Sequence, residues 1–131
     1  MNYTLTTYTD LPAVVCIMHA DFDAQADLAR VIPEVIEAFD GVGSPVYYIV
    51  DVGESRWPFP QIVQGLAQVT AAGAMLRHPN LAEVLVIADS QLVEMGVKAL
   101  AETQYGSIRT RLVSSVQDGL NTVRSQFEAT A

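Results

Sequence analysis

The chain is poor in cysteine, in basic residues and in long apolar runs. Its one cysteine, Cys16, excludes an intrachain disulfide and fits a reducing cytoplasm. Seven basic residues oppose 15 acidic ones, and the net charge of −8 disfavours nucleic acid as a partner because it repels phosphate backbones. No apolar run approaches the roughly 20 residues of a membrane helix. No basic stretch followed by an apolar one opens the chain, so we expect neither export nor membrane insertion.

What the chain does contain is enough apolar material for a core. Half of its 131 residues are hydrophobic, and this length fits one ordinary domain. We therefore expect a single domain over residues 1–131. Cys16 lies within the apolar run 13–18, so we expect it to pack as a small hydrophobic residue.

Five segments have the patterns of strands. Residues 3–8 alternate apolar or aromatic side chains with threonine, which predicts a strand with one wetter face. Residues 14–18 and 46–52 are apolar at almost every position, as is typical of strands covered on both faces. Residues 83–88 predict a fourth strand, and 109–113 alternate weakly, as in an edge strand. We expect 46–52 at the centre of the sheet.

Four segments have the period of amphipathic helices. The first spans about 23–39 and contains Pro33. An interior proline removes a backbone hydrogen bond, so we expect a kink or a break there. Further stripes of apolar residues predict helices over 62–76, 92–100 and 116–127.

The order of these elements is β-β-α-β-α-β-α-β-α. Strands that alternate with helices favour right-handed crossovers and parallel neighbours. The connection between the first two strands is too short for a crossover helix, so this pair should be antiparallel. The prediction is an α/β fold with a five-stranded mixed, mainly parallel sheet and four helices.

This order, with a short strand pair before four strand–helix units, resembles the STAS family, which includes the anti-anti-sigma factors of bacterial regulation. Residues 46–52 are similar to the central strand of the family, which ends in an aspartate, here Asp51. Residues 83–90 are similar to the next strand and its helix cap. The resemblance covers the whole chain and implies a domain that acts by binding another protein.

The segment after the central strand departs from the family. Anti-anti-sigma factors carry an Asp-Ser-x-Gly-type motif at the start of the second helix, and a partner kinase phosphorylates its serine. Here the matching residues 53–60 are longer and include Pro58 and Pro60. Ser55 is the hydroxyl of that stretch and no glycine follows it. We therefore expect no kinase switch at Ser55.

Ligand-facing groups in parallel α/β sheets gather beyond the carboxyl ends of the strands. The candidate binding residues at this edge are Asp51, Glu54, Ser55, Arg56, Trp57 and Ser90. Tryptophan and arginine are enriched in binding hot spots, so Trp57 is the expected anchor of a contact loop, with Arg56 beside it. Two alternatives stay open. In the first, Trp57 and Phe59 fold inward and cap the core. In the second, Asp23, Ser90 and Ser115 are only helix caps.

Catalysis and metal binding find little support. Cys16 lies within a strand, and no Gly-x-Ser-x-Gly elbow is present, so we expect no enzyme. His19, Asp21 and Asp23 have competent ligand atoms, but three residues on one loop do not form a closed site. We expect no metal and no cofactor.

The prediction is a regulatory or scaffolding module that binds another protein, a second copy of the chain included. The alternative is a carrier of a small apolar or lipid ligand, suggested by a distant likeness between STAS-like and lipid-carrier folds. A closed apolar cavity of several hundred cubic ångströms, on the order expected for a ligand site, would favour the carrier.

Overall fold

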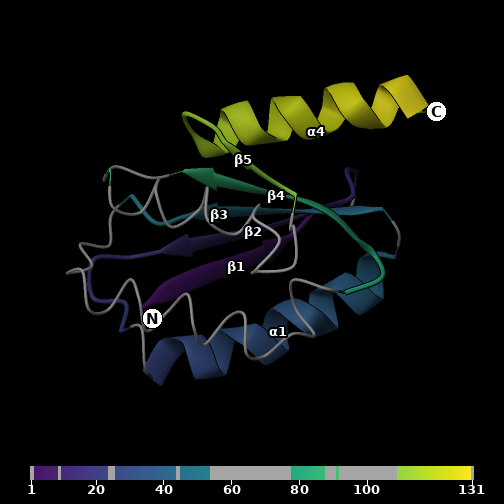
Figure 1. Cartoon of the computed structure of the whole chain (residues 1–131). Helices are drawn as coiled ribbons and strands as arrows, with labels where there is room; N and C mark the ends of the chain where they lie inside the picture. The colour runs from purple at the N-terminus through teal and green to yellow at the C-terminus, as the bar shows by residue number, and fades with distance from the viewer. Residues whose placement is uncertain are drawn as a thin grey trace.

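A five-stranded sheet lies between two helices in the computed structural model of the chain (Figure 1). The structure describes residues 2–8, 10–23, 26–43, 45–53, 78–87, 91 and 109–130. Helix α1 (Ala26–Val42) covers one face of the sheet, and helix α4 (Val116–Thr130) covers the other. The α/β class and the mixed sheet expected from the sequence are confirmed.

The strands follow one another across the sheet in chain order. They are β1 (Tyr3–Thr7), β2 (Ala13–Met18), β3 (Val46–Asp51), β4 (Leu81–Ile87) and β5 (Thr110–Leu112). β1 is antiparallel to β2, and all later neighbours are parallel. The antiparallel first pair, the central place of β3 and the edge place of β5 are therefore confirmed.

Helix α1 begins at a polar cap and continues through its proline. Asp23 Oδ1 accepts a hydrogen bond from the Ala26 amide (3.3 Å), as an N-cap does. Of the kink or break expected at Pro33, the break is wrong, because α1 is continuous over Ala26–Val42, and the kink stays a prediction. Pro33 lies on the exposed side of α1, and so does Ala29, whose carbonyl would accept the missing bond. Water can satisfy that carbonyl, which lowers the cost of the proline.

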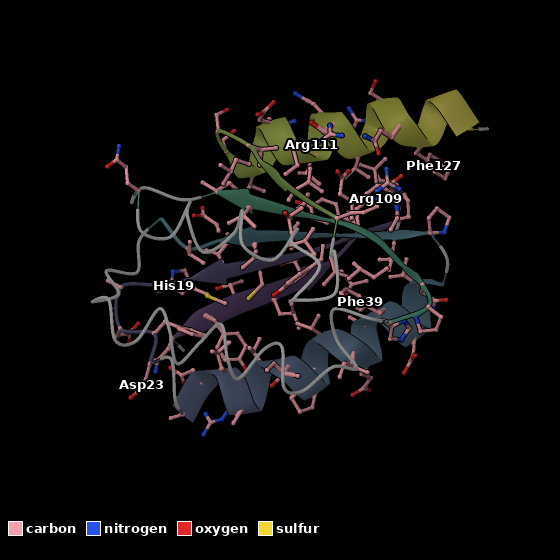
Figure 2. All side chains as sticks on the ribbon, in the orientation of Figure 1. His19, Asp23, Phe39, Arg109, Arg111 and Phe127 are labelled. Atoms are coloured by element: carbon pink, nitrogen blue, oxygen red, sulfur yellow. The ribbon has the colours of Figure 1, made fainter. Side chains whose placement is uncertain are left out.

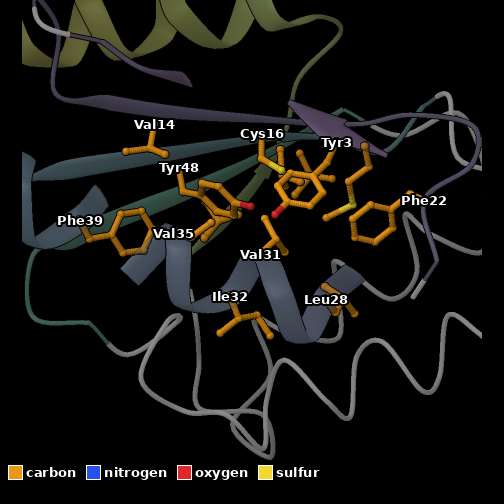
Figure 3. Packing of buried hydrophobic residues seen from close by; sticks show 14 of the residues in the cluster. Tyr3, Val14, Cys16, Phe22, Leu28, Val31, Ile32, Val35, Phe39 and Tyr48 are labelled. Carbon is orange, nitrogen blue, oxygen red and sulfur yellow. The ribbon is translucent and has the colours of Figure 1, made fainter. Parts of the chain in front are cut away.

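The core beneath α1 joins the helix to β1, β2, β3 and β4 (Figure 3). Phe39 is fully buried, and its ring meets the ring of Tyr48 edge to face at 5.6 Å between centroids. Cys16 is also fully buried in this cluster, so its predicted packing as a small hydrophobic residue is confirmed.

A second core lies beneath α4. Ile49, Leu85 and Val123 are fully buried there. Gly119 brings the helix backbone close to β3, because a Cβ placed on it would lie 3.2 Å from Ile49 Cγ2. Ser115 caps α4 by accepting a hydrogen bond from the Asp118 amide (3.0 Å).

Two of the four expected helices are described. The segments 62–76 and 92–100, predicted as the other two, lie outside the described residues. Within the described part of the chain, no helix has both the length and the apolar character that a membrane span needs.

Candidate functional site

Of the binding residues predicted at the carboxyl edge of the sheet, the structure describes Asp51. Its Oδ1 accepts a hydrogen bond from the Gly53 amide (2.9 Å), which shapes the turn that leaves β3. The remaining candidates, namely Glu54, Ser55, Arg56, Trp57 and Ser90, lie outside the described residues. The contact loop around Trp57 therefore stays a prediction.

Other polar groups near this edge have local structural roles. His19 Nε2 lies 2.8 Å from Thr4 Oγ1, and Asp23 and Ser115 cap the two helices. The cap interpretation is confirmed for both of these residues. No three His, Cys, Asp or Glu side chains among the described residues lie together as a metal site would require.

A groove lies at the opposite end of the sheet, beside the turn from β1 to β2. Its volume is about 720 Å³, and it is open to solvent. The C-terminal ends of α1 and α4 both reach this end of the sheet, on opposite faces (Figure 1). Figure 2 shows Phe127 at this end and His19 at the other. The groove is thus formed at the amino ends of the parallel strands.

The lining of the groove combines an apolar surface with acidic groups. The apolar side chains are Leu5, Leu11, Pro12, Ala38, Val42 and Phe127. Phe127 is 40% exposed, the one large hydrophobic side chain of the described residues that is so accessible. The other lining residues are Thr7, Tyr8, Asp10, Glu34, Glu37 and Gly41, and none of the lining residues is basic.

The short turn between β1 and β2 sets the shape of the groove. The Tyr8 amide donates to the Ala13 carbonyl (3.0 Å), and the Ala13 amide donates to the Leu11 carbonyl (2.8 Å). These bonds hold Leu11 inward, where it is buried, and leave Asp10 exposed. The turn therefore presents a carboxylate at the groove above an apolar base.

Glu34 connects the groove to the core. The buried Tyr3 hydroxyl donates a hydrogen bond to Glu34 Oε1 (2.8 Å). Burial and, to a smaller extent, this bond to a carboxylate raise the pKa of Tyr3 to about 12. Tyr3 thus stays protonated at neutral pH and fixes the Glu34 side chain. Glu37 lies one turn further along α1 and is exposed.

The Cys16 thiol is a poor candidate nucleophile. Burial raises its pKa to about 11, and a hydrogen bond with Tyr48 opposes that rise. The thiolate is the reactive form of cysteine, so little of it is present at neutral pH. Cys16 is therefore a core residue.

His78 joins the end of α1 to the start of β4. Its Nδ1 accepts a hydrogen bond from the Asn80 amide (3.0 Å), so the ring proton belongs on Nε2, which donates to Asp40 Oδ1 (2.7 Å). The ring also meets Phe39 edge to face at 5.5 Å. The sequence pattern did not predict this contact, because Asp40 and His78 are far apart in the chain.

The groove was also missed by reasoning from sequence. The sequence contains part of the signal for this groove. Asp10, Glu34 and Glu37 are acidic and lie outside the apolar stripes that predict the helices. The period of the last predicted helix, 116–127, places Phe127 on its apolar stripe. No family model matches the chain, and neither a curated protein nor a solved structure matches it.

Proposed function

We propose that the chain is a non-enzymatic protein-binding module with a regulatory or scaffolding role. The observation that carries this proposal is the open groove lined by apolar side chains and by the carboxylates of Asp10, Glu34 and Glu37. Apolar side chains that stay accessible at such a surface are typical of sites where proteins meet. Carboxylates at such a surface provide orientation and partner choice more than affinity.

The STAS resemblance and the cytoplasmic location are part of this proposal. What supports the resemblance is the order of the described elements, in which two strands precede the first helix and further strands and a last helix follow. The partner is another protein, and the excess of acidic residues disfavours nucleic acid.

The carrier of a small apolar or lipid ligand gains less support. That function needs a closed apolar cavity, whereas the groove in the described part of the chain is open and lined by Asp10, Glu34 and Glu37. Carboxylates would repel the headgroup of an anionic lipid. Native mass spectrometry of the purified chain would detect a retained ligand, and a stoichiometric lipid adduct would favour the carrier.

Site-specific photo-crosslinking tests the protein-binding proposal. Benzoylphenylalanine replaces Phe127 at the groove or, as a control, Ser125, which is exposed on another side of α4. We expect the probe at 127 to capture a defined protein in native extracts and the probe at 125 not to capture it. A Glu37→Lys change in the same chain should abolish that capture. Equal capture from both positions would contradict the proposal.

The loop predicted from sequence provides a second test. If Trp57 is a binding anchor, Trp57→Ala weakens partner binding by about 2 kcal/mol or more and leaves the fold intact. A sharp loss of melting temperature with unchanged affinity would instead assign Trp57 to the core.

A further inference from the structure

The backbone hydrogen bonds between β1 and β2 show which residues of β1 face its partner. The Asn2 carbonyl accepts from the His19 amide (2.9 Å), and the Tyr8 amide donates to the Ala13 carbonyl (3.0 Å). In an antiparallel pair, residues that exchange hydrogen bonds alternate with residues that do not. The even-numbered residues of this segment are therefore the ones bonded to β2.

The other residues of β1 turn their backbone groups outward. Thr4 and Thr6 point their N–H and C=O groups toward β2, whereas Tyr3, Leu5 and Thr7 point theirs to the open edge. Among the described residues, β1 has β2 as its one strand neighbour. The edge thus offers a row of backbone donors and acceptors.

The β1 strand itself lacks three features that often protect a sheet edge, namely a short length, charged residues and proline. β5, at the other edge, is three residues long and carries Arg111. β1 has five residues, none of them charged and none of them proline. Short edge strands, charges and prolines are the devices that prevent pairing with another chain. Among the described residues, β1 is therefore the edge at which an added strand meets none of these three barriers.

The groove lies directly beside this edge. Leu5 and Thr7, which turn their backbone outward, also line the groove together with Glu34 and Glu37 of α1. Successive side chains of a strand point to opposite faces of the sheet. One set of side chains of an added strand would meet these two carboxylates. The alternate set would face the side of α4, on which Phe127 lies.

We propose that β1 accepts a strand from a partner protein, and that this strand alternates basic with apolar residues. This inference rests on the proposed protein-binding function and specifies its partner. Main-chain hydrogen bonds provide affinity in such strand addition, and the alternate side chains provide specificity. The carboxylates of Glu34 and Glu37, three residues apart on α1, repel each other, and a cation between them relieves that repulsion.

A second copy of the chain is a poor occupant of the same edge. Pairing β1 with β1 would bring two acidic grooves together on chains that each carry a net charge of −8. Like charges at an interface oppose association. A partner of opposite charge fits the edge better.

Synthetic peptides test the proposal without knowledge of the natural partner. The probe is the capped hexapeptide Lys-Val-Lys-Val-Lys-Val, and its control replaces each lysine with glutamate. Two isomers carry N-methyl groups on the three lysines or on the three valines. Because alternate amides of a strand point to opposite edges, one isomer loses the donors that would face β1 and the other keeps them.

Isothermal titration calorimetry of the full chain with each peptide measures the affinity, and we expect the following results. The lysine peptide binds, the glutamate peptide does not, and one N-methyl isomer binds at least tenfold more weakly than the other. Thr7→Pro removes an outward amide and should weaken binding similarly, and by clearly more than Thr7→Val, which loses the hydroxyl group but keeps that amide. Glu37→Gln should weaken binding severalfold, and Asp21→Asn, an exposed carboxylate at the other end of the sheet, should have no effect.

The outcomes separate this inference from the proposed function. If Glu37→Gln weakens binding but the two isomers and the Thr7 variants bind alike, the groove binds and strand addition is wrong. If the isomers differ but Glu37→Gln has no effect, the basic character of the partner is wrong. If no peptide binds and the probe at 127 captures nothing, the proposed function fails as well. A dimer in sedimentation that Thr7→Pro dissociates would assign the edge to a second copy.

Discussion

Ile49 is the residue at which β3 and α4 meet, and its replacement tests the central packing of the fold. Ile49 is fully buried, and three of its side-chain carbons lie 3.2 to 3.4 Å from the place where a Cβ on Gly119 would stand. Ile49→Ala removes these three carbons. At about 0.8 kcal/mol per buried carbon, the lost transfer free energy is about 2.4 kcal/mol.

The cavity left behind adds to this loss. A residual space of about 50 Å³ costs about 1.2 kcal/mol at about 24 cal/mol per Å³. We therefore expect Ile49→Ala to lower the free energy of unfolding by about 3 to 4 kcal/mol, within the range of about 2 to 5 kcal/mol for such changes. Ile36→Ala, the same change at a half-buried position of α1, should cost less.

A second substitution makes the test specific to the contact. Gly119→Ala alone combines a helix-propensity gain of about 1 kcal/mol with a clash against Ile49, so we expect a net loss of up to about 2 kcal/mol. In the Ile49→Ala background the clash is gone, and Gly119→Ala should stabilise by about 1 kcal/mol. The sign of its effect should therefore reverse between the two backgrounds.

Urea titration followed by circular dichroism measures all four chains of this cycle. A loss under about 1 kcal/mol for Ile49→Ala would mean that β3 is not the buried central strand. An equal effect of Gly119→Ala in both backgrounds would mean that α4 does not pack on Ile49.

Three further predictions concern buried polar groups. Hydrogen bonds, of which the one from the Asp23 amide has the largest effect, hold the pKa of Asp27 below its usual range. The ionised Asp27 side chain therefore stabilises the fold above the unfolded pKa of about 3.9, and this stabilisation is lost as the pH falls through the lower folded pKa. Asp27→Asn should thus cost about 1 to 2 kcal/mol at neutral pH and progressively less in acid, and a cost that urea titrations find independent of pH would contradict this. Arg111→Met removes the cation whose Nε lies 3.4 Å from an oxygen of buried Glu83. Because Arg111 is half exposed, we expect the free energy of unfolding to fall by about 1 to 2 kcal/mol. Adding Glu83→Gln in the same chain should recover part of this loss. Cys16 should resist Ellman's reagent in the folded chain and react in urea, and rapid labelling of the folded chain would refute its burial.

The strands were predictable because their apolar runs match their burial. Residues 14–18 and 46–52 were read as strands covered on both faces, and β2 and β3 lie in the interior of the sheet between the two helices. The caps at Asp23 and Ser115 were also predictable, since a cap is a local hydrogen bond between residues three apart. The continuity of α1 through Pro33 was not predictable from the pattern, because the cost of a helical proline depends on whether water reaches the freed carbonyl.

The groove was harder to predict because it depends on segments far apart in the chain. Both helices run opposite to the parallel strands, so their C-terminal ends lie at the amino edge of the sheet, on opposite faces, rather than at the edge where the site was expected (Figure 1). Phe127 continues the apolar stripe of α4 beyond Val123, but its burial depends on what lies beneath that turn of the helix. A periodic pattern identifies the face of a helix and cannot show where along the helix the core ends.

The proposed recognition at the amino edge is tested most directly by chemical-shift mapping. The ¹⁵N-labelled chain is titrated with the Lys-Val-Lys-Val-Lys-Val peptide, and backbone amide shifts are recorded for every assigned residue. We expect the largest changes at Leu5, Thr7 and Tyr8 and along the segment 34–42, with the carboxyl edge unaffected. Shifts concentrated instead at Asp51 and in residues 53–60 would contradict the account and assign binding to the loop after the central strand.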